Sequence, residues 1–115
     1  MEINTRREKD VVIVTVKGRM GEVSAPEFEK RMNELINDGE TKFLIDLEGL
    51  EYISSAGLRG LLAAAKVLKE RNGQIFLSGL MGAVKDVFEV SQFISIFSTF
   101  ETVDSALSEI WLLNG

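Results

Sequence analysis

The sequence contains no cysteine and no histidine among its 115 residues. Without cysteine there is no disulfide, no thiol nucleophile and no thiolate-bound metal. Without histidine there is no Ser-His-Asp triad, no imidazole-bound zinc and no access to the commonest general base near neutral pH. The loops that cradle nucleotide phosphates, Gly-x-x-x-x-Gly-Lys-Ser/Thr and Gly-x-Gly-x-x-Gly, do not occur. We therefore expect that the protein is not an enzyme and that it binds neither a metal ion nor a cofactor.

Long hydrophobic runs and basic clusters are also missing. No stretch approaches the roughly 20 apolar residues of a membrane span, and Met1 is followed by polar sequence without a signal-peptide pattern. The chain has 18 acidic and 13 basic residues, hence a net charge of −5, and Lys and Arg form no long run. Nucleic acids and anionic membranes attract clustered cations. We expect a cytoplasmic protein that binds neither nucleic acid nor membrane.

The length and composition predict one folded domain. At 115 residues the chain is long enough for a single hydrophobic core and too short for two. Its 45% hydrophobic and 27% charged residues are typical of a folded protein rather than a disordered one. We expect one domain over residues 1–115, present as a monomer or a weak dimer.

Strand and helix patterns alternate along the chain. Residues 11–16 are β-branched almost throughout, which is typical of a strand buried on both faces. The polar residues 8–10 before it predict a tight hairpin turn from a first strand at 2–7. Apolar periodicity predicts further strands at 43–47, 74–78 and 96–100, and helices at 24–36, from 54 or 55 to 70, around 84–88 and at 103–111. The run Ser24-Ala25-Pro26-Glu27 predicts a capping box at the first helix.

Strands separated by helices of this length predict parallel pairing through right-handed crossovers. The expected fold class is therefore α/β, with a mixed and mostly parallel sheet, an N-terminal antiparallel hairpin and about four helices. In open sheets of this kind, partners meet the loops at the carboxyl ends of the strands. Two such loops are expected here, at residues 18–24 and 48–55, and we expect them to be neighbours.

Two adjacent serines, Ser54 and Ser55, stand between an apolar strand pattern and a strong helix pattern. Free backbone N–H groups and the positive end of the helix dipole favour an added negative charge there. The site is therefore a plausible place for a phosphate. Either serine is equally suited to act as a plain N-cap, a role worth about 1 kcal/mol. The two roles are compatible.

The residues around these serines resemble a known family. Leu44-Ile45-Asp46-Leu47, followed by Tyr-Ile-Ser-Ser-Ala-Gly-Leu-Arg at 52–59, closely resembles the bacterial anti-sigma factor antagonists, the STAS-domain family. The resemblance extends to Gly18-Arg19-Met20 and to Ala25-Pro26-x-Phe28, and it covers nearly the whole chain. It implies a single STAS-like domain that regulates transcription and has no catalytic activity.

The resemblance also implies a mechanism. Proteins of this kind bind an anti-sigma factor, often a serine kinase, and so free a sigma factor. The kinase phosphorylates a serine of the antagonist, which ends the binding, and a metal-dependent phosphatase of the PP2C type restores it. Some members are not phosphorylated, which leaves an alternative: an adaptor, either a stress-complex scaffold or a lipid-transport accessory.

The family's usual motif is Asp-Ser-Ser/Thr-Gly-Leu, with the first hydroxyl residue as acceptor. Aligned on Gly57-Leu58, the implied phosphoacceptor is Ser55, and Ser54 stands in place of the aspartate as the second choice. The partner-binding residues implied are Glu22, Ser54, Ser55, Ala56, Gly57 and Arg59.

Several of these residues have a second, structural interpretation. Gly57 either packs closely against the sheet or leaves room for a partner. Arg59 and Glu22 are either solvated or hold the partner, and Asp46 is either a hydrogen-bonded structural residue or lies near the partner loop. We expect a phosphate on Ser55 to leave the fold intact and to act on the partner, through bulk and through repulsion from Glu22, Glu48, Glu51 or partner acids.

Overall fold

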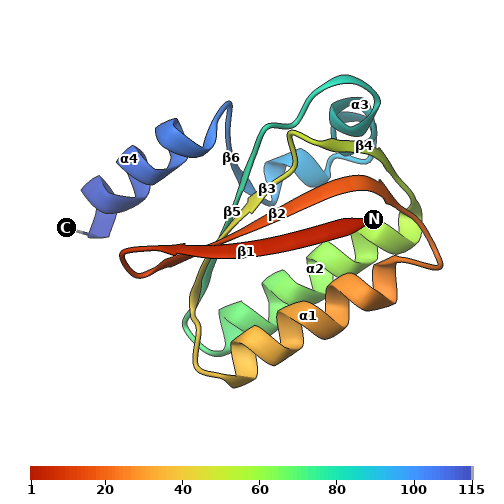
Figure 1. Ribbon diagram of the computed structural model, residues 1–115. Coiled ribbons are helices and arrows are strands. Elements are labelled where there is room, and N and C mark those ends of the chain that lie inside the picture. The colour runs from red at the N-terminus through yellow and green to blue at the C-terminus, as the bar shows by residue number, and fades with distance from the viewer. Residues whose placement is uncertain (115) are drawn as a thin grey trace.

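The computed structural model describes residues 1–114, in which strands and helices alternate after an N-terminal hairpin (Figure 1). The elements in chain order are β1 (Glu2–Glu8), β2 (Val11–Met20), α1 (Ala25–Asn37), β3 (Lys42–Asp46), β4 (Leu50–Ile53), α2 (Ser55–Glu70), β5 (Gln74–Ser78), α3 (Gly82–Val90), the short 3₁₀ helix η1 (Phe93–Ser95), β6 (Ser98–Phe100) and α4 (Val103–Asn114).

The strands form one mixed sheet in the order β1-β2-β3-β5-β6, with β4 paired to β2 off this path. β1 and β2 are antiparallel and are joined by a two-residue turn, so the predicted hairpin is confirmed. The pairs β2–β3, β3–β5 and β5–β6 are parallel, as helical crossovers require. The predicted fold class, with its four helices and mostly parallel sheet, is confirmed.

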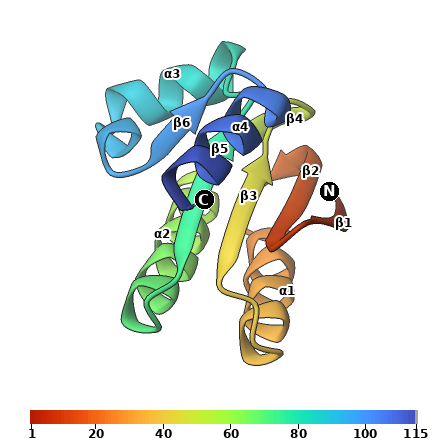
Figure 2. The ribbon, with the colours of Figure 1, turned by 90° about the vertical axis from the view of Figure 1, so that its left-hand side faces the viewer.

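Helices cover both faces of the sheet. Figures 1 and 2 show α1 and α2 together on one face and α4 on the other. The side chains of β2 divide between the two layers: Val12, Val14 and Val16 belong to the larger core, which includes residues of α1 and α2. Val11 and Ile13 belong to the smaller core beneath α4. This confirms the prediction of a strand buried on both faces, and it makes β2 the fixed frame to which the site is attached.

The sequence prediction was wrong over residues 48–55, which were expected to form a loop. β2 does not stop at Gly18; it shifts register between Gly18 and Arg19 and continues to Met20. Gly18 has a φ of 92°, which glycine adopts readily. This bent extension of β2 provides the pairing edge for β4, in the register Gly18–Leu50, Arg19–Tyr52 and Met20–Ile53. A four-residue strand with buried ends and two exposed central residues has no alternation for a sequence pattern to detect.

The predicted capping box at Ser24 does not form. The Ser24 hydroxyl donates to the Arg19 carbonyl at 2.9 Å and accepts the Gly21 N–H at 2.9 Å, and it makes no cap hydrogen bond to α1. The side chain therefore closes the loop before the helix, because that loop turns back on the bent end of β2. The last strand is also shorter than the predicted 96–100, since it begins at Ser98 after η1.

Candidate functional site

The end of β2 and the start of α2 lie against each other, as expected for the loops at the carboxyl ends of the strands. The Ser54 backbone N–H donates to the Met20 carbonyl at 2.9 Å. β4 lies between them in the chain and pairs with β2 up to Ile53. The first turn of α2 is thus tied to the sheet by a backbone hydrogen bond as well as by packing.

Gly57, in the first turn of α2, lies close against the end of β2 and against β4. A Cβ at this position would lie 2.6 Å from Ile53 Cγ1 and 2.8 Å from the Met20 carbonyl oxygen. Both distances are shorter than van der Waals contact, and the Met20 oxygen is backbone that cannot move aside cheaply. The close-packing interpretation of Gly57 is therefore the one that the geometry supports. Its contribution to partner binding stays a prediction.

The two serines have different surroundings. Ser54 is the N-cap of α2: its backbone is extended, and its side-chain oxygen accepts the Gly57 N–H at 3.3 Å. Ser55 is the first residue of the helix and is exposed. Within residues 1–114 the Ser55 hydroxyl has no hydrogen-bond partner. The capping role thus falls to Ser54, which leaves the Ser55 hydroxyl accessible.

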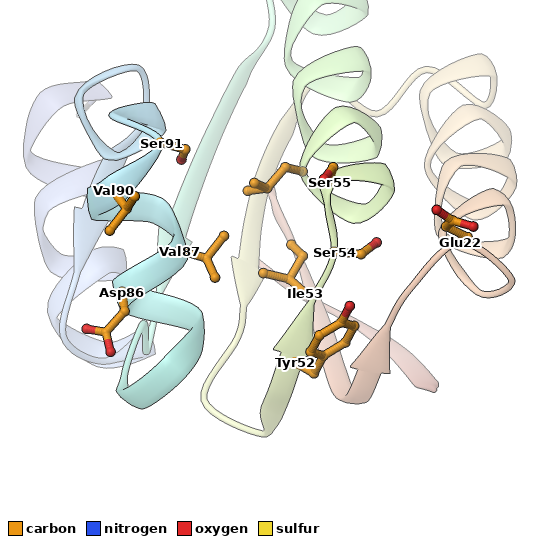
Figure 3. A pocket seen from close by; sticks show the side chains of 10 residues that line it. Glu22, Tyr52, Ile53, Ser54, Ser55, Asp86, Val87, Val90 and Ser91 are labelled. Atoms are coloured by element: carbon orange, nitrogen blue, oxygen red, sulfur yellow. The ribbon is translucent and has the colours of Figure 1, made fainter.

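A groove of about 640 Å³ opens beside these serines, between the start of α2, β4 and α3 (Figure 3). We call it the serine groove. Figure 3 shows Ile53 and Val87 pointing toward each other across it. Its ten lining residues are Glu22, Tyr52, Ile53, Ser54, Ser55, Leu58, Asp86, Val87, Val90 and Ser91.

The structure brings together some of the predicted partner-binding residues but not all. Glu22, Ser54 and Ser55 line the serine groove. Arg59 is exposed on α2 but does not line the groove, and Ala56 is half-buried. Of the three acidic residues expected to repel a phosphate, Glu22 lines the groove with Ser55, whereas Glu48 and Glu51 do not.

Asp46 has a structural role at the end of β3. Its Oδ1 accepts the Glu48 backbone N–H at 3.1 Å, which shapes the turn into β4. This is the hydrogen-bonded interpretation offered by the sequence. Neither Asp46 nor Glu48 lines the serine groove.

Two features at or beside the groove could not be predicted from the sequence. The first is its α3 wall, where Val90 is 85% exposed although it ends an apolar helix. The second is a cation–π pair in which the Arg19 guanidinium lies 4.2 Å from the centre of the Tyr52 ring. These residues are 33 positions apart and meet because β2 and β4 pair in that register. A helical pattern does not distinguish an exposed valine from a buried one, so neither feature had a signal in the sequence.

The described residues, 1–114, include no group of three or more acidic, histidine or cysteine side chains placed to hold a metal ion. Among those residues there is also no helix with the length and apolar character needed to cross a bilayer.

Replacement of the two serines should separate capping from exposure. Ser54→Ala removes the N-cap and should lower the free energy of unfolding by about 1 kcal/mol. Ser55→Ala removes an unpartnered exposed hydroxyl and should change it by less than about 0.5 kcal/mol. Urea unfolding of both variants checks this, and equal losses would contradict the assignment of the cap to Ser54.

Two glycines of α2 provide a matched test of the close approach. Gly57→Ala should cost about 1–3 kcal/mol of unfolding free energy, because the added methyl group meets the Met20 backbone. Gly60→Ala is the control, since its Cβ would meet the flexible Glu29 side chain at 3.3 Å. Alanine has the higher helix propensity, so Gly60→Ala should be neutral or stabilising by up to about 1 kcal/mol. A Gly57→Ala protein as stable as Gly60→Ala would show that α2 can move away from β2.

Three comparisons bear on what this protein is. The family model described as the STAS domain matches residues 2–106. BtrV of Bordetella bronchiseptica, named as an anti-sigma factor antagonist, is 33% identical over 106 residues, which cover 92% of this chain and 91% of BtrV.

Solved structures agree on the fold. A Thermotoga maritima protein described as an anti-sigma factor antagonist superposes with a TM-score of 0.87 at 23% identity, over 93% of this chain and 92% of that one. The anti-sigma factor antagonist SpoIIAA of Bacillus, in its unphosphorylated form, superposes with a TM-score of 0.75 at 15% identity, over 95% and 97%. Its phosphorylated form gives 0.74 at 16%, over 95% and 99%. The chain belongs to the STAS-domain family and, within it, to the anti-sigma factor antagonists, which are regulatory binding proteins and not enzymes.

Proposed function

We propose that this protein binds an anti-sigma factor of the serine-kinase type, frees a sigma factor for transcription in the cytoplasm, and is switched off by phosphorylation of Ser55. A phosphatase of the PP2C type would reverse the switch. The observation that carries the proposal is the accessible Ser55 hydroxyl at the start of α2, beside a groove that a partner can enter.

The division of roles between the serines supports Ser55 as the acceptor. A kinase needs a hydroxyl that it can reach. Ser54 is half-buried and its side-chain oxygen accepts the Gly57 N–H, whereas Ser55 is exposed. Modification of Ser54 would replace the hydroxyl oxygen that accepts the Gly57 N–H, while modification of Ser55 leaves that hydrogen bond in place. The same residue is the acceptor implied by alignment with the family motif.

The start of α2 can accommodate a phosphate without refolding. The N–H groups of the first helical turn have no acceptor within the helix, and the helix dipole favours negative charge there. A phosphate adds about −1.5 to −2 charges and three acceptor oxygens. The match of this chain to SpoIIAA in both its unphosphorylated and its phosphorylated form, with TM-scores of 0.75 and 0.74, is in line with a switch that leaves the fold unchanged.

The phosphate would act on the partner instead. Ser55 shares the serine groove with the apolar side chains of Ile53, Leu58 and Val87. A partner that covers this groove would have to strip water from a dianion, a cost that an unmatched charge does not recover. A penalty of about 3 kcal/mol lowers affinity roughly a hundredfold.

The test is incubation with candidate anti-sigma kinases and ATP, followed by mass spectrometry of the modified peptide. We expect phosphate on Ser55, retained in Ser54→Ala and absent from Ser55→Ala. Binding of the phosphorylated protein to the same kinase should be roughly a hundredfold weaker than that of the unmodified protein, with an unchanged circular dichroism spectrum. Ser55→Asp should weaken binding in the same direction, and Ser108→Asp, an exposed serine on α4, is the control for added charge.

Other outcomes decide against parts of the proposal. Label on Ser54 alone would move the acceptor by one residue. A tight complex without any label would favour the phosphorylation-independent adaptor. A Ser55→Asp protein that keeps its fold and binds as well as the Ser108→Asp control would remove the switch.

A further inference from the structure

The wall of the serine groove formed by α3 is apolar and open. Val87 and Val90 lie three residues apart, so they share one side of the helix. Val90 is 85% exposed, and Val87 lies opposite Ile53 of β4 (Figure 3). The inner side of α3 is occupied by Val84 and Phe88, which are buried in the core and hold the helix in place. An aliphatic side chain left exposed beside an apolar groove is typical of a contact surface.

Acidic side chains flank this apolar surface. Glu22 comes from the loop after β2, and Asp86 comes from α3. Figure 3 shows them on opposite sides of the groove. None of the ten lining residues is basic; the Arg19 guanidinium lies outside the lining, over the Tyr52 ring. The groove therefore offers an apolar centre between two negative charges, and a binding segment of opposite pattern is complementary to it.

The groove wall next to the serines is fixed before a partner arrives. The Tyr52 ring is 40% exposed and lies under the Arg19 guanidinium, 4.2 Å away. Ile53 and Leu58 are buried at 3% and 6% exposure. Because these side chains are already ordered, binding has little of their rotamer freedom left to remove.

We infer that the serine groove receives a segment of the anti-sigma factor that carries aliphatic side chains between two basic residues. This inference rests on the proposed function for the identity of the partner. The aliphatic side chains lie against Val87, Val90 and Leu58, and the basic residues face Glu22 and Asp86. The volume of about 640 Å³ is in the range of pockets that enclose a small ligand or a few side chains.

The same arrangement explains how a phosphate on Ser55 excludes a basic segment. Ser55 and Leu58 lie three residues apart on α2 and both line the groove, so the phosphate would stand beside the aliphatic side chain of Leu58. The basic residues of the segment are already paired with Glu22 and Asp86, so they return little to the dianion, whereas its desolvation under an aliphatic side chain is not compensated. A phosphate on Ser55 therefore weakens binding of the segment although the segment is positively charged.

A probe that needs no kinase tests the groove. The peptide acetyl-Lys-Leu-Leu-Lys-amide is titrated into the full-length ¹⁵N-labelled protein, with acetyl-Glu-Leu-Leu-Glu-amide as the charge control. We expect saturable shifts of the Val87, Val90 and Leu58 amides with the lysine peptide, at a dissociation constant on the order of 1 mM. The glutamate peptide should bind about tenfold more weakly or not at all.

A matched pair of variants locates the contact. Val90→Lys places a positive charge in the groove wall and should weaken binding of the lysine peptide by about tenfold. Leu112→Lys is the control, because Leu112 is 77% exposed on α4 and the net charge changes equally. Val90→Lys should also weaken binding of the anti-sigma kinase more than Leu112→Lys does.

The outcomes separate this inference from the proposed function. Lysine-peptide shifts absent from the groove, equal binding of the two peptides, or equal effects of Val90→Lys and Leu112→Lys would each overturn the inference. If the lysine peptide binds saturably but no kinase phosphorylates Ser55, the inference about the groove holds and the proposed regulation by phosphorylation is wrong. If Ser55 is phosphorylated but Val90→Lys does not change kinase binding, the proposed regulation holds and the inference about the groove is wrong.

Discussion

The site depends on how closely the first turn of α2 approaches the bent end of β2. With glycine at position 57, the helix backbone packs against Met20 and Ile53 at a distance that no side chain would allow. The Ser54 N–H donates to the Met20 carbonyl, and β4 pairs with the bent end of β2 directly before α2 begins. The first part of β2, residues 11–16, contributes side chains to both hydrophobic cores, so the position of the strand is determined by the packing of both layers. Because the first turn of α2 is attached to β2, it is held in place as well, and Ser55 with it.

A rigid attachment of this kind suits a switch that works by surface chemistry. The Ser54 side-chain oxygen accepts the Gly57 N–H, so the cap of α2 does not depend on the Ser55 hydroxyl. A charge added at Ser55 meets the favourable end of the α2 dipole within its own chain, where the effect is typically a few tenths to 1 kcal/mol. Toward a partner the balance is reversed. An ion pair in water at 4 Å returns about 1 kcal/mol, whereas burying an ion costs several. The modification is therefore tolerated by the fold and opposed by the interface.

Much of the fold could be predicted from local patterns, because those patterns report burial directly. The β-branched run of β2 and the apolar stripe of α2 are consequences of the layers that cover them. β4 could not be predicted, since its pairing depends on a bend at Gly18 that is distant in sequence. Ser24 matched a capping pattern, but its hydroxyl bonds to Arg19 and Gly21 instead, because the tertiary structure folds that loop back on the end of β2. The α3 wall of the groove was missed for the same reason: which valines of a helix remain exposed depends on the neighbouring elements.

Whether a phosphate on Ser55 acts on the partner and not on the fold can be measured by comparing amide spectra of the ¹⁵N-labelled protein with serine and with phosphoserine at position 55, the latter incorporated during synthesis. We expect shifts confined to the first turn of α2 and the residues of the serine groove, together with roughly hundredfold weaker binding to the anti-sigma factor. Shifts that spread through β3 and β5 would show that the phosphate reorganises the core. Unchanged binding, with the phosphate in place, would contradict the claim that the partner covers Ser55.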